Sequence, residues 1–254
     1  MSKSAADDGC EITELETSSG PCVYGDPSSP TTVVLFGDSH AAQWFPALNR
    51  LAKEHHWRLV ALSKTLCGAV DHPVWNGQLT RSYPECDAWR ANALARIKAE
   101  HPALVVISNS KFASFDNGGH QATSAQTEAG WTAAVASMIR RIGAPTTPVV
   151  VIGDTPQMAV DPADCLSGHQ SNALACANPR AMAVDWQRLA EDRQAAAETG
   201  ASFIDPTRWT CPTEPCPAVI GSLLVYLDAG HLSSTFSTAL APYLYAALPH
   251  LPDG

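Results

Sequence analysis

The chain has 254 residues, of which 45% are hydrophobic and 16% are charged, and its formal net charge is −9. This composition is typical of one globular domain with a substantial core, and no apolar run approaches the roughly 18 residues that a transmembrane helix needs. The acidic charge argues against nucleic acid or an anionic membrane surface as a partner, because both require clustered Lys and Arg.

Hydrophobic patterning predicts strands that alternate with helices along the chain. Short β-branched and apolar runs predict strands at residues 31–36, 57–62, 103–107, 148–152 and 202–204. Apolar residues at helical spacing predict helices at residues 41–54, 86–99, 124–142, 179–199 and 234–247. Such alternation implies a parallel sheet covered on both faces. We therefore predict an α/β fold, a three-layer α/β/α sandwich with a parallel sheet of about five strands, over residues 31–254 after a polar lead at residues 1–30.

Long loops interrupt this pattern and are expected to build binding surfaces, as long ordered loops on α/β scaffolds often do. They span residues 68–84, 112–123, 159–178 and 208–225. Trp75, Trp131 and Trp209, two of which lie in or near these loops, could stack on sugar rings, although tryptophans are more often core residues.

Eight cysteines form four couples that are close in the sequence, and each couple flanks a stretch with loop-forming residues. The couples are Cys10 with Cys22, Cys67 with Cys86, Cys165 with Cys176, and Cys211 with Cys216. None has the C-x-x-C spacing of a zinc knuckle, and no paired histidines lie beside them at metal-ligand spacing. We therefore predict disulfides, with this local pairing preferred among the many possible connectivities, and no metal site.

Disulfides predict an oxidising, extracytoplasmic compartment, either periplasmic or at the cell surface. The N-terminus, from Met1 to Asp8, lacks the apolar core of a signal peptide. We therefore expect an excised fragment whose export depends on an upstream segment.

A candidate nucleophile follows the first predicted strand, where the sequence is Gly37-Asp38-Ser39-His40 and a helix begins at once. Ligands of open parallel sheets bind beyond the carboxyl ends of strands, so Ser39 would lie at the edge of a crevice and near a helix N-terminus. The alternative is a tight turn that only caps the helix. We interpret Asp38 as fixing this turn, whereas His40 either lines the pocket or is solvated.

A candidate base lies near the other end of the chain, in Asp228-Ala229-Gly230-His231, just before the last predicted helix. A serine hydroxyl needs a base to become a nucleophile, and that base needs an acceptor to orient it. Two intervening residues allow Asp228 to accept from one imidazole nitrogen of His231 while the other faces Ser39. An isolated D-x-x-H is more often a surface turn, but together with Ser39 the catalytic interpretation is favoured.

The two motifs, Gly37-Asp38-Ser39-His40 and Asp228-Ala229-Gly230-His231, resemble those of the SGNH (GDSL-like) hydrolase superfamily. More narrowly, G-D-S-H, the loop of Cys67 and the several cysteine couples resemble the SGNH domains fused to membrane acyltransferases of the acyltransferase-3 type. Those multipass proteins O-acylate surface glycans. The resemblance implies that Ser39 is the nucleophile, that His231 is first a general base and then an acid, and that Asp228 orients His231.

The resemblance also implies an oxyanion hole formed by the backbone N–H of Ser39 with Gly68 and Asn109. The usual G-x-N-D of the superfamily is replaced here by Ile107-Ser108-Asn109-Ser110. Asn109 could therefore be a turn residue instead, and Gly68 could be a simple loop glycine.

We therefore expect an O-acyltransferase domain that moves a short acyl group, preferably acetyl, through an ester on Ser39 to a hydroxyl of a cell-surface carbohydrate or glycolipid. The acyl donor would be delivered by a membrane acyltransferase domain on the same native chain, and no cofactor is expected. A secreted carbohydrate esterase or deacetylase would use the same residues with water as acceptor. A non-catalytic glycan-binding module with an idle triad is the third possibility.

Overall fold

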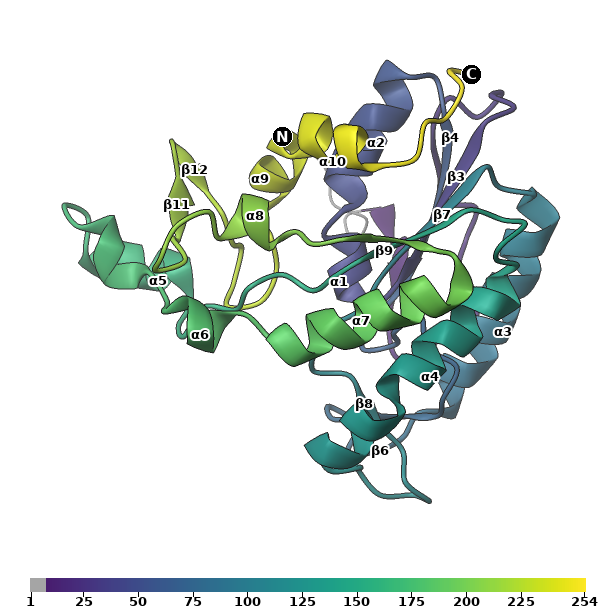
Figure 1. The fold of residues 1–254 in the computed structure, drawn as a ribbon, viewed down its shortest axis with the longest axis horizontal. Coiled ribbons are helices and arrows are strands. Elements are labelled where there is room, and N and C mark those ends of the chain that lie inside the picture. Colours follow the sequence, from purple (N-terminus) through teal and green to yellow (C-terminus); the bar gives the residue numbers. More distant parts are fainter. Residues whose placement is uncertain (1–7) are drawn as a thin grey trace.

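The computed structural model describes residues 8–254, and it shows one central sheet with helices on both faces (Figure 1). The strand order is β1-β4-β3-β7-β9-β10, and β2 also pairs with β4. The strands are β1 (Glu11–Ile12), β2 (Val23–Gly25), β3 (Thr32–Gly37), β4 (Arg58–Lys64), β7 (Leu104–Ser108), β9 (Val149–Ile152) and β10 (Ser202–Ile204). Every pairing is parallel except that of β2 with β4. The predicted α/β class with a parallel sheet is confirmed.

Side chains of the central strands alternate between two hydrophobic layers, as the pleat of a strand requires. Val33 and Leu35 of β3 pack with α2 (Phe45–Glu54), α9 (Ser234–Ala239) and α10 (Ala241–Ala247) on one face. Val34 and Phe36 pack on the opposite face with helices that Figure 1 shows side by side. Those helices are α3 (Pro84–Glu100), α4 (Ser124–Ile142) and α7 (Trp186–Thr199). The molecule therefore has the predicted three layers.

Three predicted helices are each divided in two. Residues 41–54 become α1 (Ser39–Ala42) and α2, and residues 234–247 become α9 and α10. The second helix of each pair carries a proline in its first turn, where the missing N–H costs nothing. The helix predicted at residues 179–199 divides into α6 (Arg180–Ala183) and α7, because the side chain of Asp185 caps a new helix by accepting from the N–H of Arg188.

The polar lead contributes more structure than its sequence indicates, because β1 and β2 belong to the central sheet although no strand was predicted there. Lys64, at the end of β4, holds this segment by donating from Nζ to three carbonyl oxygens at 2.5–2.9 Å. Those oxygens belong to Thr13, Glu14 and Glu16. The boundary at residue 31 remains a prediction.

The long loops carry small elements of their own. A second sheet of order β6-β5-β8 comprises β5 (Val74–Asn76), β6 (Arg81–Ser82) and β8 (Ser114–Phe115). A hairpin pairs β11 (Val219–Ile220) with β12 (Leu223–Leu224). The remaining short helices are α5 (Pro162–Gly168), the 3-10 turn η2 (Ala173–Cys176) and α8 (Thr207–Thr210).

All eight cysteines are paired as predicted, and each disulfide closes a local loop. The bonds are Cys10–Cys22, Cys67–Cys86, Cys165–Cys176 and Cys211–Cys216. Four disulfides are typical of proteins that fold in an oxidising compartment.

Within residues 8–254, no helix has both the length and the apolar character needed to span a bilayer.

Candidate active site

The site lies where the carboxyl ends of three neighbouring strands meet. Gly37 at the end of β3 pairs in register with Ser63 of β4 and Ser108 of β7. A β-carbon on Gly37 would stand 2.3 Å from the backbone oxygen of Ser108, so the close approach of β3 and β7 requires glycine. Asp38 therefore follows one strand directly beside Asn109, which follows the next.

The structure brings the three predicted triad residues together. Ser39 Oγ lies 2.9 Å from His231 Nε2, although 192 residues separate them. The other ring nitrogen of His231, Nδ1, lies 2.9 Å from Asp228 Oδ2 and 3.1 Å from Oδ1. An imidazole with Nδ1–H donated to a carboxylate leaves Nε2 free to accept the serine proton.

Backbone hydrogen bonds keep Asp228 ionised. Partial burial would raise the pKa of Asp228, but the N–H groups of Gly230 and His231 donate to Oδ1 at 2.8 Å and lower the pKa below its usual value, as does the His231 side chain. A carboxylate that stays charged near neutral pH is the form that can orient His231 and stabilise its imidazolium.

Hydrogen bonds hold the loop that carries Asp228 and His231 to the end of α1 and to the residues after β9. Gln43, just after α1, accepts from the N–H of Leu232 at 2.8 Å through Oε1. Thr155 donates from its hydroxyl to the carbonyl of Gly230 at 3.3 Å, and the N–H of Met158 donates to Ala229 at 2.7 Å. These bonds link the position of His231 to that of Ser39.

The two predicted oxyanion residues are neighbours. A β-carbon on Gly68 would lie 3.0 Å from Asn109 Oδ1 and 3.5 Å from Asp38 Oδ2. Asn109 is buried, and its Oδ1 accepts from the N–H of Ala69 at 2.6 Å, which directs the amide nitrogen elsewhere. That buried nitrogen, Nδ2, has no partner among the described residues. A buried donor without a partner costs free energy, which is typical of a group that meets a ligand.

A second carboxylate–histidine pair is buried beside the triad. His40 Nδ1 lies 2.5 Å from Asp154 Oδ1, and both side chains are about 5% exposed. The rings of His40 and His231 lie against each other, with centroids 4.6 Å apart. Burial alone would lower the pKa of His40, but the carboxylates of Asp154, Asp38 and Asp228 together raise it to about 9. His40 is therefore an imidazolium next to the triad histidine, and its interpretation as a solvated residue is wrong.

A family model described as "SGNH domain (fused to AT3 domains)" matches residues 9–246. The chain belongs to this SGNH family. Among solved structures, the periplasmic domain of a lipopolysaccharide acetyltransferase from Salmonella ser. Paratyphi A is similar, with a TM-score of 0.62 and 16% identity over 96% of this chain and 85% of that chain. A carbohydrate esterase family 2 enzyme from Corynascus thermopiles (Myceliophthora fergusii) has a TM-score of 0.49 and 18% identity over 87% of this chain and 67% of that chain. No curated protein sequence matches the chain.

Asp38 of this SGNH domain serves the turn, as its sequence position predicts. Its Oδ1 accepts from the N–H of His40 at 2.9 Å, and its Oδ2 accepts from the N–H of Ser110 at 2.9 Å. Burial raises the pKa of Asp38, although His40 and these two N–H groups oppose the increase. Asp38 thus ties the residues after β3 to those after β7, with no contact to the His231 imidazole among the described hydrogen bonds.

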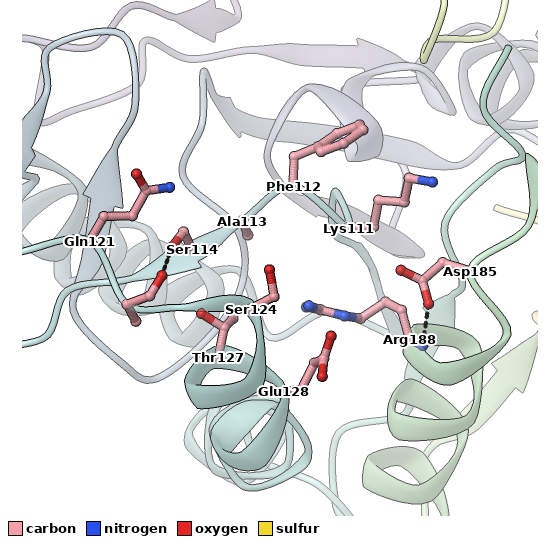
Figure 2. A pocket seen from close by; sticks show the side chains of 11 residues that line it. Lys111, Phe112, Ala113, Ser114, Gln121, Ser124, Thr127, Glu128, Asp185 and Arg188 are labelled. Carbon is pink, nitrogen blue, oxygen red and sulfur yellow. Dashed lines mark hydrogen bonds between the residues drawn. The ribbon is translucent and has the colours of Figure 1, made fainter. Parts of the chain in front are cut away.

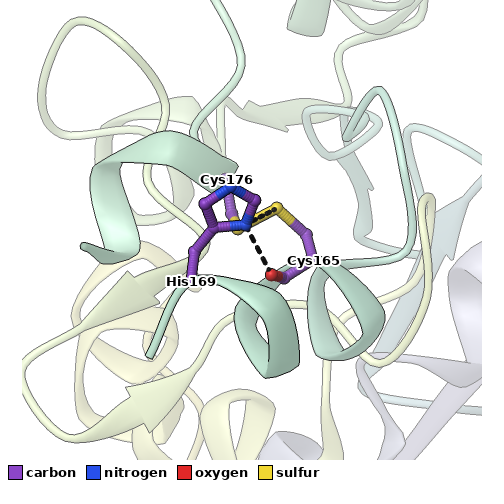
Figure 3. A group of neighbouring side chains, drawn as sticks. All are labelled: Cys165, His169 and Cys176. Atoms are coloured by element: carbon purple, nitrogen blue, oxygen red, sulfur yellow. Dashed lines mark hydrogen bonds between the residues drawn. A yellow bond between two sulfur atoms is a disulfide. The ribbon is translucent and has the colours of Figure 1, made fainter. Parts of the chain in front are cut away.

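One group of potential metal ligands occurs among residues 8–254, in the SGNH domain's α5 region (Figure 3). Cys165, His169 and Cys176 have ligand atoms within 4.8 Å of one another. The two sulfurs are bonded to each other, with His169 Nδ1 at 3.8 and 4.0 Å, and Nδ1 also lies 2.9 Å from the carbonyl of Cys165. Disulfide sulfurs are not thiolate ligands, so this group does not fit a zinc site.

The three candidate tryptophans lie in different environments in the SGNH domain. Trp131 is fully buried in the core, and Trp209 packs edge-on against Trp44. Trp75 is half-buried and lines a cavity that also includes Asp38. Only Trp75 among these three therefore lies where it can meet a ligand near the triad.

Asp154, Gln43 and Thr155 are the site residues that sequence reasoning missed. Asp154 follows β9 in Gly153-Asp154-Thr155, so its position at the carboxyl end of a parallel strand was the available signal. Nothing in the spacing of Gln43 and Thr155 indicates the loop that they hold, because their partners are more than 70 residues away.

Proposed function

We propose that this domain is an O-acyltransferase that carries a short acyl group, preferably acetyl, as an ester of Ser39. The observation that carries the proposal is the hydrogen-bonded series from Ser39 Oγ through His231 to Asp228. Membership of an SGNH family described as fused to AT3 domains supports it, because a membrane acyltransferase on the same chain would supply the acyl group.

In the first half-reaction, Ser39 Oγ attacks the carbonyl carbon of the acyl donor while His231 Nε2 takes the hydroxyl proton. Collapse of the tetrahedral intermediate breaks the bond to the leaving group, and His231 returns the proton to that group. In the second half-reaction, an acceptor hydroxyl attacks the Ser39 ester, His231 takes its proton, and Ser39 recovers a proton as it leaves. Asp228 holds Nδ1–H throughout and stabilises the imidazolium formed in each step.

The negative charge of each tetrahedral intermediate would be bound by the backbone N–H groups of Ser39 and Gly68 and by Nδ2 of Asn109. Neither backbone N–H donates to another described residue, and Asn109 Nδ2 is equally unpartnered. Donors fixed before the reaction need no reorganisation when the charge develops, which makes them effective catalysts.

The proposed acceptor is a hydroxyl of a cell-surface carbohydrate or glycolipid, reached outside the cytoplasm. The similar Salmonella structure is described as a periplasmic domain of a lipopolysaccharide acetyltransferase, and the four disulfides fit the same kind of compartment. We infer that a membrane acyltransferase domain on the same native chain delivers the acyl group.

A serine-directed organophosphonate tests the nucleophile directly. Intact-mass analysis should show one adduct, located at Ser39 by peptide mapping. The adduct should be lost in Ser39→Ala and form far more slowly in His231→Ala, whereas His120→Ala, at an exposed histidine, should react as the wild type does. No adduct on folded wild-type protein would overturn a catalytic role and favour a non-catalytic glycan-binding module.

An acetyl ester offered with and without oligosaccharides separates transfer from hydrolysis. Acetylated saccharide, detected by mass spectrometry and absent with Ser39→Ala, is the expected product. Ester hydrolysis that no acceptor diverts would identify a carbohydrate esterase instead, because water and an acceptor hydroxyl compete for the same Ser39 ester.

A further inference from the structure

Two neighbouring cavities share one wall, and the smaller one reaches Asp38, the residue before Ser39. The smaller, of about 220 Å³, is lined by Asp38 and Ser110 near the nucleophile and by Trp75. The larger, of about 400 Å³, extends to α7 and is shown in Figure 2. Their common lining residues are Phe112, Ala113, Ser114 and Gln121. Neither lining includes Ser39 itself, but the shared wall makes the larger cavity an extension of the one that begins next to it.

Hydrogen-bonding side chains from the N-terminal ends of two helices line part of the larger cavity. Ser124 and Glu128 come from α4, and Asp185 and Arg188 come from the start of α7 (Figure 2). In the figure the Arg188 guanidinium extends from α7 into the space between these helices.

Arg188 is held rigidly and has a free donor. It is 5% exposed, and its guanidinium lies 3.6 Å over the ring of Trp131. Nε lies 3.4 Å from Glu191 Oε2, yet Nη1 is buried without a hydrogen-bond partner among the described residues. Arg188 is one of the residues that line the cavity, and a buried guanidinium N–H without a partner is costly unless a ligand accepts from it.

The charges of the cavity identify the ligand's chemistry. Lys111 and Arg188 are balanced by Glu128 and Asp185, so the lining is neutral overall and presents both donors and acceptors. Phe112, 58% exposed at the shared wall, adds an apolar face. An anion would meet two carboxylates here. A neutral sugar residue suits the lining better, because its hydroxyls both donate and accept and its C–H face packs on an aromatic ring.

We propose that this cavity binds a neutral sugar residue of the acceptor, with Arg188 Nη1 donating to a sugar hydroxyl and Phe112 packing against the sugar between the two cavities. The proposal rests on the function given above, since it assigns the acceptor subsite of the same reaction. The hydroxyl to be acylated would then belong to a neighbouring part of the saccharide, nearer Ser39.

Binding is tested in the Ser39→Ala variant of this 254-residue chain, which cannot form the Ser39 ester. Maltotetraose, mannotetraose, galactotetraose and chitotetraose would be titrated while the Nε–H resonance of Arg188 and the side-chain amide of Gln121 are followed by NMR. We expect saturable shifts with at least one neutral tetrasaccharide. Shifts with none of the four, or shifts only with inorganic phosphate or glucuronic acid, would overturn the assignment of a neutral-sugar site.

Two substitutions and matched controls localise the site. Arg188→Lys keeps the charge but removes the planar donor fork and should weaken binding about tenfold, whereas Arg193→Lys on the exposed side of α7 should not. Phe112→Ala should weaken binding, whereas Tyr243→Ala, at an exposed aromatic on α10, should not. Unchanged affinity in Phe112→Ala and in folded Arg188→Lys would place the saccharide elsewhere and refute the proposal.

The same variants separate this proposal from the proposed function. Organophosphonate labelling of Ser39 with no saccharide binding would leave the nucleophile intact and remove the subsite. Saccharide binding without labelling would keep the subsite and remove the acyl-serine mechanism. Where both hold, Glu128→Gln should lower the ratio of transfer to hydrolysis, and Glu198→Gln, at the exposed far end of α7, should leave it unchanged.

Discussion

Replacing Asp154 by asparagine probes the buried pair behind the triad with almost no change in shape. Asp154 accepts three hydrogen bonds, from His40 Nδ1 and the N–H of Thr155 through Oδ1 and from the N–H of Lys111 through Oδ2. The amide of Asp154→Asn has one oxygen for these donors, so its NH₂ group must face a backbone N–H or the imidazolium. We expect the replacement of one carboxylate oxygen by NH₂ to lower the stability of the fold strongly.

The magnitude follows from the cost of breaking a buried ion pair. Removing one partner of a buried ion pair costs about 3–5 kcal/mol, because the other charge stays buried without compensation. The raised pKa of His40 has the matching direction, because Asp154, together with Asp38 and Asp228, favours the charged imidazole. A loss of about 3 kcal/mol should lower the midpoint of thermal unfolding by roughly 6–12 °C in a domain of this size.

The effect should depend on pH with a defined sign. The folded-state pKa of His40 lies above its unfolded value, so its contribution is complete below about pH 6.5 and is lost as the pH rises through about 9. The pKa of Asp154 is lowered: burial opposes this, but His40 and the Lys111 and Thr155 N–H groups prevail. The contribution of Asp154 is therefore present above its unfolded pKa near 3.8 and is lost as the pH falls. The His40–Asp154 pair therefore contributes most to the stability of the fold above pH 3.8 and below about pH 6.5.

Urea unfolding followed by tryptophan fluorescence, with the disulfides intact, measures the free energy of unfolding at pH about 6 and about 10. Asp154→Asn should be less stable than wild type by about 3 kcal/mol at the lower pH and by clearly less at the higher pH. Asp164→Asn, on the exposed side of α5, should change stability by less than about 0.5 kcal/mol. A loss below about 1 kcal/mol at pH 6, or a loss that grows with pH, would refute a charged His40–Asp154 pair.

Four further changes test the site and its frame. Asp228→Asn should lower kcat by about 10⁴, because the amide favours the wrong His231 tautomer, and an unchanged pH–rate profile with full activity would exclude its orienting role. Asn109→Ala should lower kcat for ester turnover by about 10²–10³ and should leave the affinity for the saccharide almost unchanged. Gly68→Ala should also slow turnover, since its β-carbon would lie 3.0 Å from Asn109 Oδ1, and crystallography would show whether Asn109 moves. Cys67→Ser with Cys86→Ser opens a loop whose ends are 19 residues apart and should cost about 3 kcal/mol in urea unfolding.

The layered architecture was predictable because buried parallel strands are continuous apolar runs. Residues 32–37 and 104–108 contain almost only such side chains, and each is followed by a helix with one apolar face. The strands β1 and β2 were not predictable, because two or three residues are too few for a hydrophobic period to appear. Breaks inside helices were missed although Pro46 and Pro242 mark them, because a proline in the first turn of a new helix leaves the apolar spacing intact.

The candidate site was partly predictable, because two of its residues lie in short sequence motifs. Ser39 and His231 are marked by short motifs that stand at the end of a strand and just before a helix, and their contact follows from the topology. Asp154 has no such motif, since it contacts His40 across 114 residues and is a lone acid in the sequence. A buried donor without a partner, such as Asn109 Nδ2, results from tertiary packing, so no pattern of residue types in the sequence reveals it.

Access of water decides whether such a site transfers or hydrolyses. The side chain of His231 is 33% exposed and that of Asp228 is 46% exposed, while Ser39 is half-buried. An ester on Ser39 in this conformation is open to water, which is present at far higher concentration than any glycan and would be activated by the same imidazole. Transfer therefore requires that the bound acceptor, or a domain placed over this edge of the sheet, excludes water while the ester exists. The cavity that holds Arg188 is lined in part by Lys111–Ser114, which follow the carboxyl end of β7, so a saccharide bound there would bring the rest of the acceptor to this edge of the sheet.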